Sequence, residues 1–253
     1  KKRNDELGVL SNSLDEMTKE LNNRIKTTEN FSTDLVHEIR NPLASLKSAS
    51  EIISDTTDKE KQEKLLKIMI HDVSRIDRLI TDYSQMLKDE LAISSEQMED
   101  VDLKPIIESV VDDFNNIYIE KKNLNIKLNT SGSKKYLIKG ISNRLEQIIA
   151  NLLDNAVSFS NNGSSVLVDL NKDDSNISLK VIDQGDGFRE TDIKKVFDRF
   201  YSNRPENFGE HSGLGLNIVK NLVDIHKGEI FASNDPQGGA IVEIKFPKVI
   251  SKS

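Results

Sequence analysis

The residue types best suited to chemistry gather in one segment, FSTDLVHEIRNPLASLK, at residues 31–47. His37 is followed directly by Glu38 and, four residues after the histidine, by Asn41. On a helix, the leucine and isoleucine side chains of this segment form one apolar stripe, and His37 and Asn41 share a face that points away from it. Such a helix presents an imidazole to solvent for chemistry on the ring. Taken alone, the segment is also compatible with a solvated histidine beside a chance pattern.

A second candidate is a pair of amides, Asn151 and Asn155, one helical turn apart in NLLDNA. The neighbouring residues are mostly apolar, so the polar face of this helix is expected to line a site. Amide oxygens there are suited to hold Mg²⁺ or its waters beside a triphosphate. The alternative is two solvent-facing amides without a function.

Two glycine-containing segments follow. Asp183 ends an apolar strand pattern and precedes Gly185 and Gly187. Its carboxylate can accept a hydrogen bond from an exocyclic amine such as that of adenine, while the glycines permit a tight turn; a plain β-turn is the alternative. Residues 209–215, GEHSGLG, precede an amphipathic helix, an arrangement suited to phosphate. This segment matches neither the Walker A nor the Rossmann pattern, and a flexible linker is its alternative.

Composition narrows the functions that these residues can serve. The chain has 253 residues, a formal net charge of −7 and no cysteine. The negative charge argues against a nucleic-acid partner, and the lack of cysteine excludes disulfides, thiolate catalysis and zinc–cysteine sites. No run approaches the roughly 18 apolar residues of a membrane span. The chain begins Lys-Lys-Arg-Asn-Asp without a methionine, which we interpret as a fragment of a longer protein.

The elements that must position these residues begin with two long helices. Apolar residues recur at spacings of three and four over residues 5–25, which predicts a coiled-coil or bundle seam, with an amphipathic helix on its own core as the alternative. The pattern continues to about Ile53, and Pro42 is expected to kink the helix or remove one hydrogen bond. After a turn at residues 54–59, a second helix carries an apolar stripe too wide for one partner helix. Two such hairpins make a four-helix bundle, which predicts a homodimer.

Beyond about Leu91 the pattern changes to short strands and helices. VDLKPIIESVVDDFNNIYIEKKN predicts a strand followed by a helix. Further strands are predicted in NIKLN, KYLIKG, VLVDLN, ISLKVIDQG, GEIFASN and AIVEIKFP, with helices at 141–157 and about 214–226. This mixture predicts an α/β domain with one sheet.

Taken together, these motifs resemble a known family. In chain order, HEIRNP, NLLDNA, DQGDGF, FDRFY and GEHSGLGLNIVK resemble the H, N, G1, F and G2 boxes of sensor histidine kinases. Each motif is weak singly, but five in this order over residues 31–247 are very specific. Residues 5–25 resemble the second helix of a HAMP signalling linker. NAVSFS and RFYSNRPENFGEHSGLGL are similar to the ChvG/ExoS-type envelope sensors of α-proteobacteria.

The resemblance implies a multidomain α and α/β protein in three parts. Residues 1–25 would be the end of a HAMP linker or a coiled-coil helix. Residues 26–92 would be a helical hairpin for dimerisation and histidine phosphotransfer, forming a dimeric four-helix bundle. Residues 93–253 would be the catalytic ATP-binding domain, an α/β sandwich of the Bergerat type shared with gyrase, Hsp90 and MutL.

The resemblance also implies roles for individual residues. His37 would be the phospho-accepting histidine, Glu38 would orient its imidazole and act as base, and Asn41 would position water when the protein dephosphorylates its partner. Asn155 would ligate Mg²⁺ with help from Asn151. Asp183 would recognise adenine. The nucleotide pocket and its lid would be shaped by Gly185, Gly187, Gly213, Leu214 and Gly215, and the lid segment would be packed by Phe197 and Phe200.

One departure from the family concerns phosphate. A lysine, arginine or histidine usually stands three residues after the second asparagine of NLLDNA, where this chain has Ser158. A different cation, such as Arg144, Arg199 or Arg204, would have to take its place.

Three other histidines have simpler interpretations. His71 is interpreted as solvated, and His226 as a cation that caps a helix end. His211 falls in the lid, where contact with phosphate is one option. Their spacing does not predict a metal site.

The resemblance implies a protein histidine kinase. With ATP and Mg²⁺ it would phosphorylate His37 and pass the phosphoryl group to an aspartate of a response regulator receiver domain, with phosphatase activity as well. The alternatives are a GHKL-type ATPase, which uses a glutamate where Asn151 stands, and a nucleotide-binding scaffold without kinase activity. The chain would act as a homodimer on the cytoplasmic side of the bacterial inner membrane, attached only through segments absent from it.

Overall fold

The computed structural model describes residues 6–93, 96–131, 135–190, 192–201 and 213–249. The chain divides into two compact units, Lys1–Ile80 and Thr81–Ser253. Each unit is described by itself below. No helix among the described residues carries a stretch long and apolar enough to cross a membrane.

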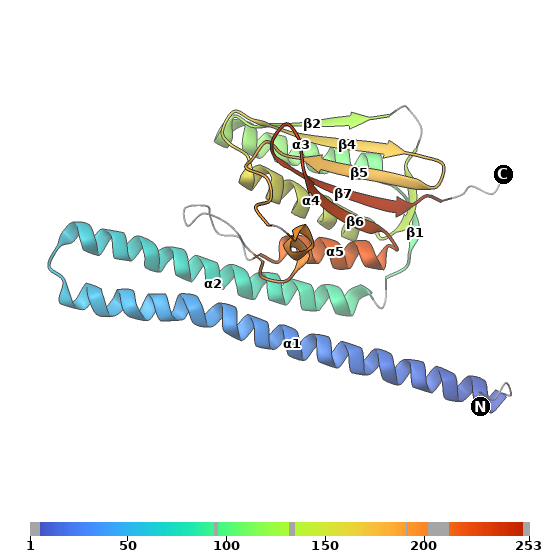
Figure 1. The fold of residues 1–253 in the computed structure, drawn as a ribbon, viewed down its shortest axis with the longest axis horizontal. Helices are drawn as coiled ribbons and strands as arrows, with labels where there is room; N and C mark the ends of the chain where they lie inside the picture. Colours follow the sequence, from blue (N-terminus) through green and yellow to red (C-terminus); the bar gives the residue numbers. More distant parts are fainter. Residues whose placement is uncertain (1–5, 94–95, 132–134, 191, 202–212, 250–253) are drawn as a thin grey trace. The chain divides into compact units, whose positions relative to one another are not determined.

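The first unit contains a helical hairpin. Helix α1 runs from Glu6 to Asp55 without interruption, with Pro42 inside it, and helix α2 runs from Lys59 to Ile93, so that its last part, from Thr81, belongs to the second unit (Figure 1). The turn between them is closed by Asp58, whose Oδ1 accepts hydrogen bonds from the backbone nitrogens of Glu60 at 3.0 Å and Lys61 at 3.4 Å. An aspartate in this position caps the free N–H groups of a helix start. The predicted helix–turn–helix is confirmed.

The hairpin leaves much of its apolar surface exposed. The apolar side chains that remain exposed include Val36, Leu43, Ile52, Leu66, Ile68, Ile70 and Val73. Leu43 belongs to the apolar stripe that the sequence predicts for residues 31–47. Because each large aliphatic side chain gains about 1.5–3 kcal/mol on full burial, a surface of this kind favours association with a further apolar partner.

The second unit is built from short strands and helices. In chain order they are β1 (Glu99–Asp102), α3 (Leu103–Lys122), β2 (Asn125–Thr130), β3 (Leu137–Gly140), α4 (Ser142–Phe159), β4 (Ser165–Lys172), β5 (Asn176–Ile182), η1 (Ile193–Phe197), α5 (Gly215–Ile225), β6 (Glu229–Asn234) and β7 (Ala240–Pro247). The short 3₁₀ helix η1 is absent from the sequence prediction. The other elements were predicted, with bounds that shift by a few residues.

The strands form two sheets, so the prediction of one sheet is wrong. The larger sheet has the order β2-β4-β5-β7-β6, and only the β2–β4 pair is parallel. Strands β1 and β3 pair separately as an antiparallel ribbon. Asp102 holds this ribbon to the start of α3, because its Oδ1 accepts from the backbone nitrogens of Lys104 at 3.2 Å and Tyr136 at 3.0 Å. An alternating pattern predicts a strand but not its pairing partner.

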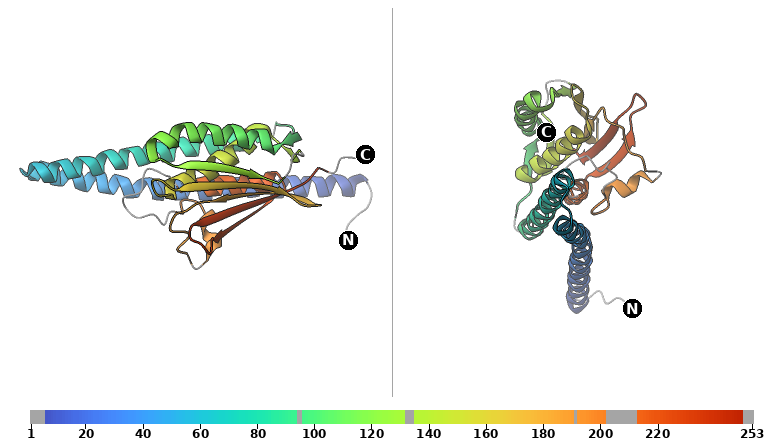
Figure 2. Two further views of the ribbon diagram at one scale, coloured as in Figure 1. Left: turned by 90° about the horizontal axis from the view of Figure 1, so that it is seen from above. Right: turned by 90° about the vertical axis from the view of Figure 1, so that its left-hand side faces the viewer.

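The core lies between the larger sheet and helices α3, α4 and α5, which cover one face of it (Figure 2). Alternate side chains of β4, Val166, Val168 and Leu170, are fully buried against these helices. The opposite face carries polar pairs, such as the hydrogen bond from Asn129 to Asp169. This one-sided burial is typical of a sheet with helices on one face, and the predicted α/β sandwich is confirmed.

Candidate functional site

The Asp183 carboxylate lies directly after β5 and is 7% exposed. Its Oδ1 accepts hydrogen bonds from the backbone nitrogens of Gly185 at 2.9 Å and Ala240 at 3.0 Å. Burial raises the pKa of Asp183 above the usual value of an aspartate, and the two backbone hydrogen bonds partly oppose this change. No described residue donates to Oδ2. This arrangement holds the carboxylate in one orientation and leaves an acceptor oxygen for a ligand.

The loop after Asp183 needs glycine at two positions. A Cβ at Gly185 would lie 2.6 Å from the carbonyl oxygen of Phe159, at the end of α4. Gly187 has a φ of +75°, and a Cβ there would lie 2.9 Å from Oδ1 of Asn234 on β6. The loop is therefore pressed between α4 and β6, a closer approach than a plain surface turn would require.

The two amides of α4 meet the start of α5. A Cβ at Gly215 would lie 3.3 Å from Nδ2 of Asn155 and 3.7 Å from Oδ1 of Asn151. Leu214, at the N-cap position of α5, is buried, and its side chain makes no capping hydrogen bond. A helix start of this kind is suited to an anion, and the amide nitrogen of Asn155 and the amide oxygen of Asn151 lie beside it.

The aromatic residues of the FDRFY segment also reach α5. Phe197 in η1 is buried, and its carbonyl oxygen accepts a hydrogen bond of 2.9 Å from the side-chain amide of Asn217 on α5. Gly213 has a φ of +73°, and a Cβ there would lie 2.8 Å from the backbone of Phe200. Sequence reasoning missed Asn217, although a polar residue on the buried side of an apolar helix was a usable signal.

The hydroxyl of Ser158 is turned toward its own helix, where it donates to the carbonyl oxygen of Asn155 at 2.8 Å. Among the three arginines offered as a substitute cation, Arg199 is half-buried near η1. Arg204 lies outside the described residues, as do residues 209–212, which include His211.

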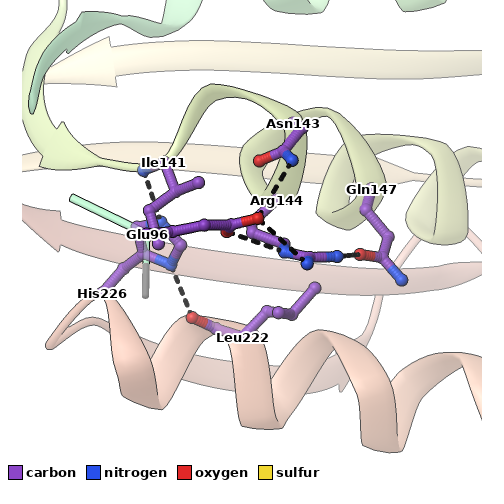
Figure 3. Close-up of polar contacts among 7 residues, drawn as sticks. All are labelled: Glu96, Ile141, Asn143, Arg144, Gln147, Leu222 and His226. Carbon is purple, nitrogen blue, oxygen red and sulfur yellow. Dashed lines mark hydrogen bonds and ion pairs between the residues drawn. The ribbon is translucent and has the colours of Figure 1, made fainter. Parts of the chain in front are cut away.

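The third arginine, Arg144, is excluded as the phosphate contact. It is 7% exposed, and its Nε and Nη2 donate to the Glu96 carboxylate at 3.2 and 3.3 Å, while Nη1 donates to Gln147 at 3.3 Å (Figure 3). It also lies eleven residues before Asn155 on α4, which is about 16 Å along a helix. Its guanidinium is paired and distant from the amides, so its role is structural.

His226 caps α5 as predicted, but not as a cation. The buried ring donates through Nδ1 to the carbonyl oxygen of Leu222 at 2.7 Å and accepts through Nε2 from the backbone nitrogen of Ile141 at 3.1 Å (Figure 3). Nε2 needs its lone pair for this bond, so the imidazole is neutral. Burial lowers the pKa of His226 accordingly. His71 is exposed, as expected, with Asp72 3.7 Å from its Nδ1.

The helical hairpin presents the other group of candidates. His37 and Asn41 are exposed on α1, and no side chain among the described residues hydrogen-bonds to the His37 ring. Oε2 of Glu38 accepts a hydrogen bond of 3.1 Å from Nη2 of Arg75 on α2. Both partners are half-buried. Sequence reasoning missed Arg75, because 37 residues separate the pair and no local pattern links them.

Comparison with known families assigns both parts of the chain. Residues 27–91 match the His Kinase A (phospho-acceptor) domain, and residues 140–250 match the histidine kinase-, DNA gyrase B- and HSP90-like ATPase family. The first range contains His37, and the second contains Asn155 and Asp183.

Individual proteins agree with these matches. The sensor protein ChvG of Agrobacterium fabrum is 36% identical over 239 residues, and the aligned region is 92% of this chain and 40% of ChvG, so the chain spans less than half of that relative. The mycobacterial sensor histidine kinase MprB superposes with a TM-score of 0.50 at 28% identity, over 60% of this chain and 97% of that one. The histidine kinase ThkA, in complex with the response regulator protein TrrA, superposes with a TM-score of 0.67 at 19% identity, over 94% of this chain and 67% of that one, which shows a common fold.

Proposed function

Because the chain belongs to the sensor histidine kinases, we propose that it transfers the γ-phosphoryl group of ATP to His37 and from there to an aspartate of a response regulator. The observation that carries the proposal is that one chain holds both halves of the reaction. An exposed histidine followed by a carboxylate lies in the phospho-acceptor match, and a buried aspartate, two amides and the start of α5 lie in the ATPase match.

In the nucleotide half, Oδ2 of Asp183 accepts a hydrogen bond from the exocyclic amine of adenine. The phosphates bind at the start of α5, where the side chain at the N-cap position, Leu214, makes no capping hydrogen bond. Asn155, assisted by Asn151, would hold Mg²⁺ beside the phosphates. The fit is supported by the cradle at Gly215, where the backbone approaches both amides without an intervening side chain. When bound, Mg²⁺ would supply positive charge that offsets the charge of the phosphate oxygens.

In the acceptor half, a ring nitrogen of His37 attacks the γ-phosphorus. The new N–P bond forms as the bond to the bridging oxygen breaks, and ADP leaves with that electron pair. Glu38 accepts the proton from the other ring nitrogen. Arg75 binds only Oε2 of Glu38, and no described residue binds Oε1, so one oxygen remains for the imidazole. Asn41, on the same exposed face as His37, holds the water that removes phosphate from the regulator.

We assign the working form as a homodimer on the cytoplasmic side of the inner membrane. The exposed apolar residues of the hairpin support pairing with a second hairpin in a four-helix bundle. The hairpin and the ATP-binding domain correspond to residues 26–92 and 93–253, and residues 1–25 to the end of a HAMP linker. The partner is the receiver domain of a response regulator. An ATP-hydrolysing machine is disfavoured because Asn151 stands where such enzymes carry a glutamate.

Incubation with γ-labelled ATP and Mg²⁺ tests the proposal. We expect label on the protein that is labile in acid and stable in base, as a phosphoimidazole is, and we expect His37→Ala to abolish it. His71→Ala is the matched control, because this histidine is also exposed on the hairpin, and it should label normally. Label that survives His37→Ala, or free phosphate without labelled protein, would contradict the assignment.

A further inference from the structure

The end of β6 and the start of β7 form hydrogen bonds with the loop that follows Asp183. Oδ1 of Asn234 accepts a hydrogen bond of 2.7 Å from the backbone nitrogen of Phe188, and Nδ2 of the same amide donates to the carbonyl oxygen of Phe188 at 2.9 Å. One side chain thus binds both backbone groups of one residue, in the way that a paired strand would. The two residues are 46 positions apart in the sequence.

The other end of the loop is held by the other side of the same turn. The backbone nitrogen of Ala240 donates to Oδ1 of Asp183, and the backbone nitrogen of Asp183 donates to the carbonyl oxygen of Ala240, both at 3.0 Å. A Cβ at Gly239 would lie 2.0 Å from the carbonyl oxygen of Asp183. Asn234 and Ala240 face each other in the β6–β7 register. Both ends of the loop are therefore fixed to one pair of facing residues.

We propose that Asn234 is a positioning residue that determines how selectively the site reads adenine. The inference rests on the proposed function, in which Oδ2 of Asp183 accepts from the adenine amine. A carboxylate can only accept, and guanine presents a carbonyl oxygen where adenine presents its amine. Rejection of guanine therefore depends on a carboxylate that cannot turn aside. Asn234 acts on that orientation through Phe188 and Gly187, and it makes no contact with the base in this scheme.

No hydrogen bond among the described residues joins the Asn234 side chain to the start of α5. The start of α5 is placed by its own contacts, which include the hydrogen bond from Asn217 to Phe197 and the approach of Gly215 to the α4 amides. Loss of the Asn234 amide should therefore weaken the base-dependent part of nucleotide affinity and leave the phosphate-dependent part unchanged. A general loss of folding would reduce both parts together, so the two explanations are separable.

Calorimetric titration of the full chain with ADP, GDP and inorganic tripolyphosphate, each with Mg²⁺, tests the proposal. For Asn234→Ala we expect about a tenfold rise in the Kd of ADP, which corresponds to about 1.4 kcal/mol. The preference for ADP over GDP should shrink by a similar factor, and the Kd of tripolyphosphate should not change. Asn234→Asp keeps the acceptor for Phe188 and loses the donor, so it should restore part of the preference.

Asn129→Ala is the matched control, because this asparagine also joins two strands of the same sheet through its side chain but lies on the opposite face. It should leave all three affinities unchanged. An unchanged ADP preference in Asn234→Ala, or an equal loss for ADP and tripolyphosphate, would overturn the role of Asn234. A wild-type chain that does not prefer ADP to GDP would overturn the proposed reading of adenine by Asp183, and this inference with it.

Discussion

Replacement of Asp183 by asparagine should separate nucleotide binding from stability. The substitution keeps the shape of the side chain and keeps Oδ1, so the hydrogen bonds from Gly185 and Ala240 can persist. It replaces Oδ2 by an NH₂ group, which donates where the carboxylate accepts. We therefore expect Asp183→Asn to lose ATP and ADP affinity without losing the fold.

The expected loss of affinity follows from the hydrogen bond that disappears. A hydrogen bond to a charged acceptor contributes about 1.5–3 kcal/mol, which corresponds to about a 10- to 150-fold rise in Kd. The new NH₂ group also faces the adenine amine, donor against donor, which moves the expectation toward the upper end of the range.

The expected effect on stability has the opposite sign. Burial raises the pKa of Asp183 in the folded state above the unfolded value. The folded state therefore binds more protons between the two pKa values, and stability falls as pH rises through that interval. Above that interval the ionised carboxylate carries the full cost of its burial. Asparagine has no charge to desolvate, so the midpoint of thermal unfolding should stay the same or rise.

Thermal unfolding followed by circular dichroism, and calorimetric titration with ADP, measure the two effects on the same samples. Asp186→Asn is the control, because Asp186 lies in the same loop but is exposed and paired with Arg189. It should bind ADP as the wild type does. The reasoning is refuted if Asp183→Asn lowers the unfolding midpoint and leaves the Kd of ADP within about twofold of wild type.

Three further predictions concern charged groups outside the base site. Arg75→Gln should slow autophosphorylation severalfold, because Glu38 loses the contact that orients it. The free energy of unfolding should change by less than about 1 kcal/mol, since the ion pair is half-exposed. Labelling rates and urea titration measure the two effects, and an unchanged labelling rate would contradict the prediction. Arg144→Leu should cost about 1–3 kcal/mol in urea titration and leave the Kd of ADP unchanged, whereas weaker ADP binding would restore Arg144 as a phosphate ligand. His226 should make the protein less stable as pH falls below about 6.5, because the pKa of His226 is lower in the folded state and the unfolded state binds the proton first. Urea titration between about pH 7.5 and 5.5 should show a smaller fall in the free energy of unfolding for His226→Gln than for the wild type. Identical pH profiles would contradict the prediction.

Most of the candidate site was predictable because its motifs are local. Asp183 with its two glycines, and the amides one turn apart on α4, can be recognised from spacing alone, since helices and strands place residues by fixed periods. The close packing of the loop between α4 and β6 could not be predicted in this way. It depends on Asn234, which contacts Phe188 from 46 residues away.

The errors have the same origin. Arg144 was a reasonable cation on sequence grounds, but its Glu96 partner lies 48 residues away, and the pairing is set by the packing of the chain before β1 against α4. His226 was predicted as a capping cation, but the backbone of Ile141, 85 residues distant, needs its lone pair and keeps it neutral. Local pattern identified both residues as special and assigned the wrong charge environment to each.

The sequence by itself determined the elements and the chemistry they carry: two long helices with an exposed His37, and an α/β part with an aspartate, two amides and glycines in a specific order. It could do so because periodicity, capping and glycine conformation act over a few residues. Only the tertiary structure decided which charged and polar groups pair, that β1 and β3 form a separate ribbon, and that Asn234 holds the Asp183 loop. Those outcomes depend on contacts between distant segments, and such contacts are selected by the packing of the whole unit.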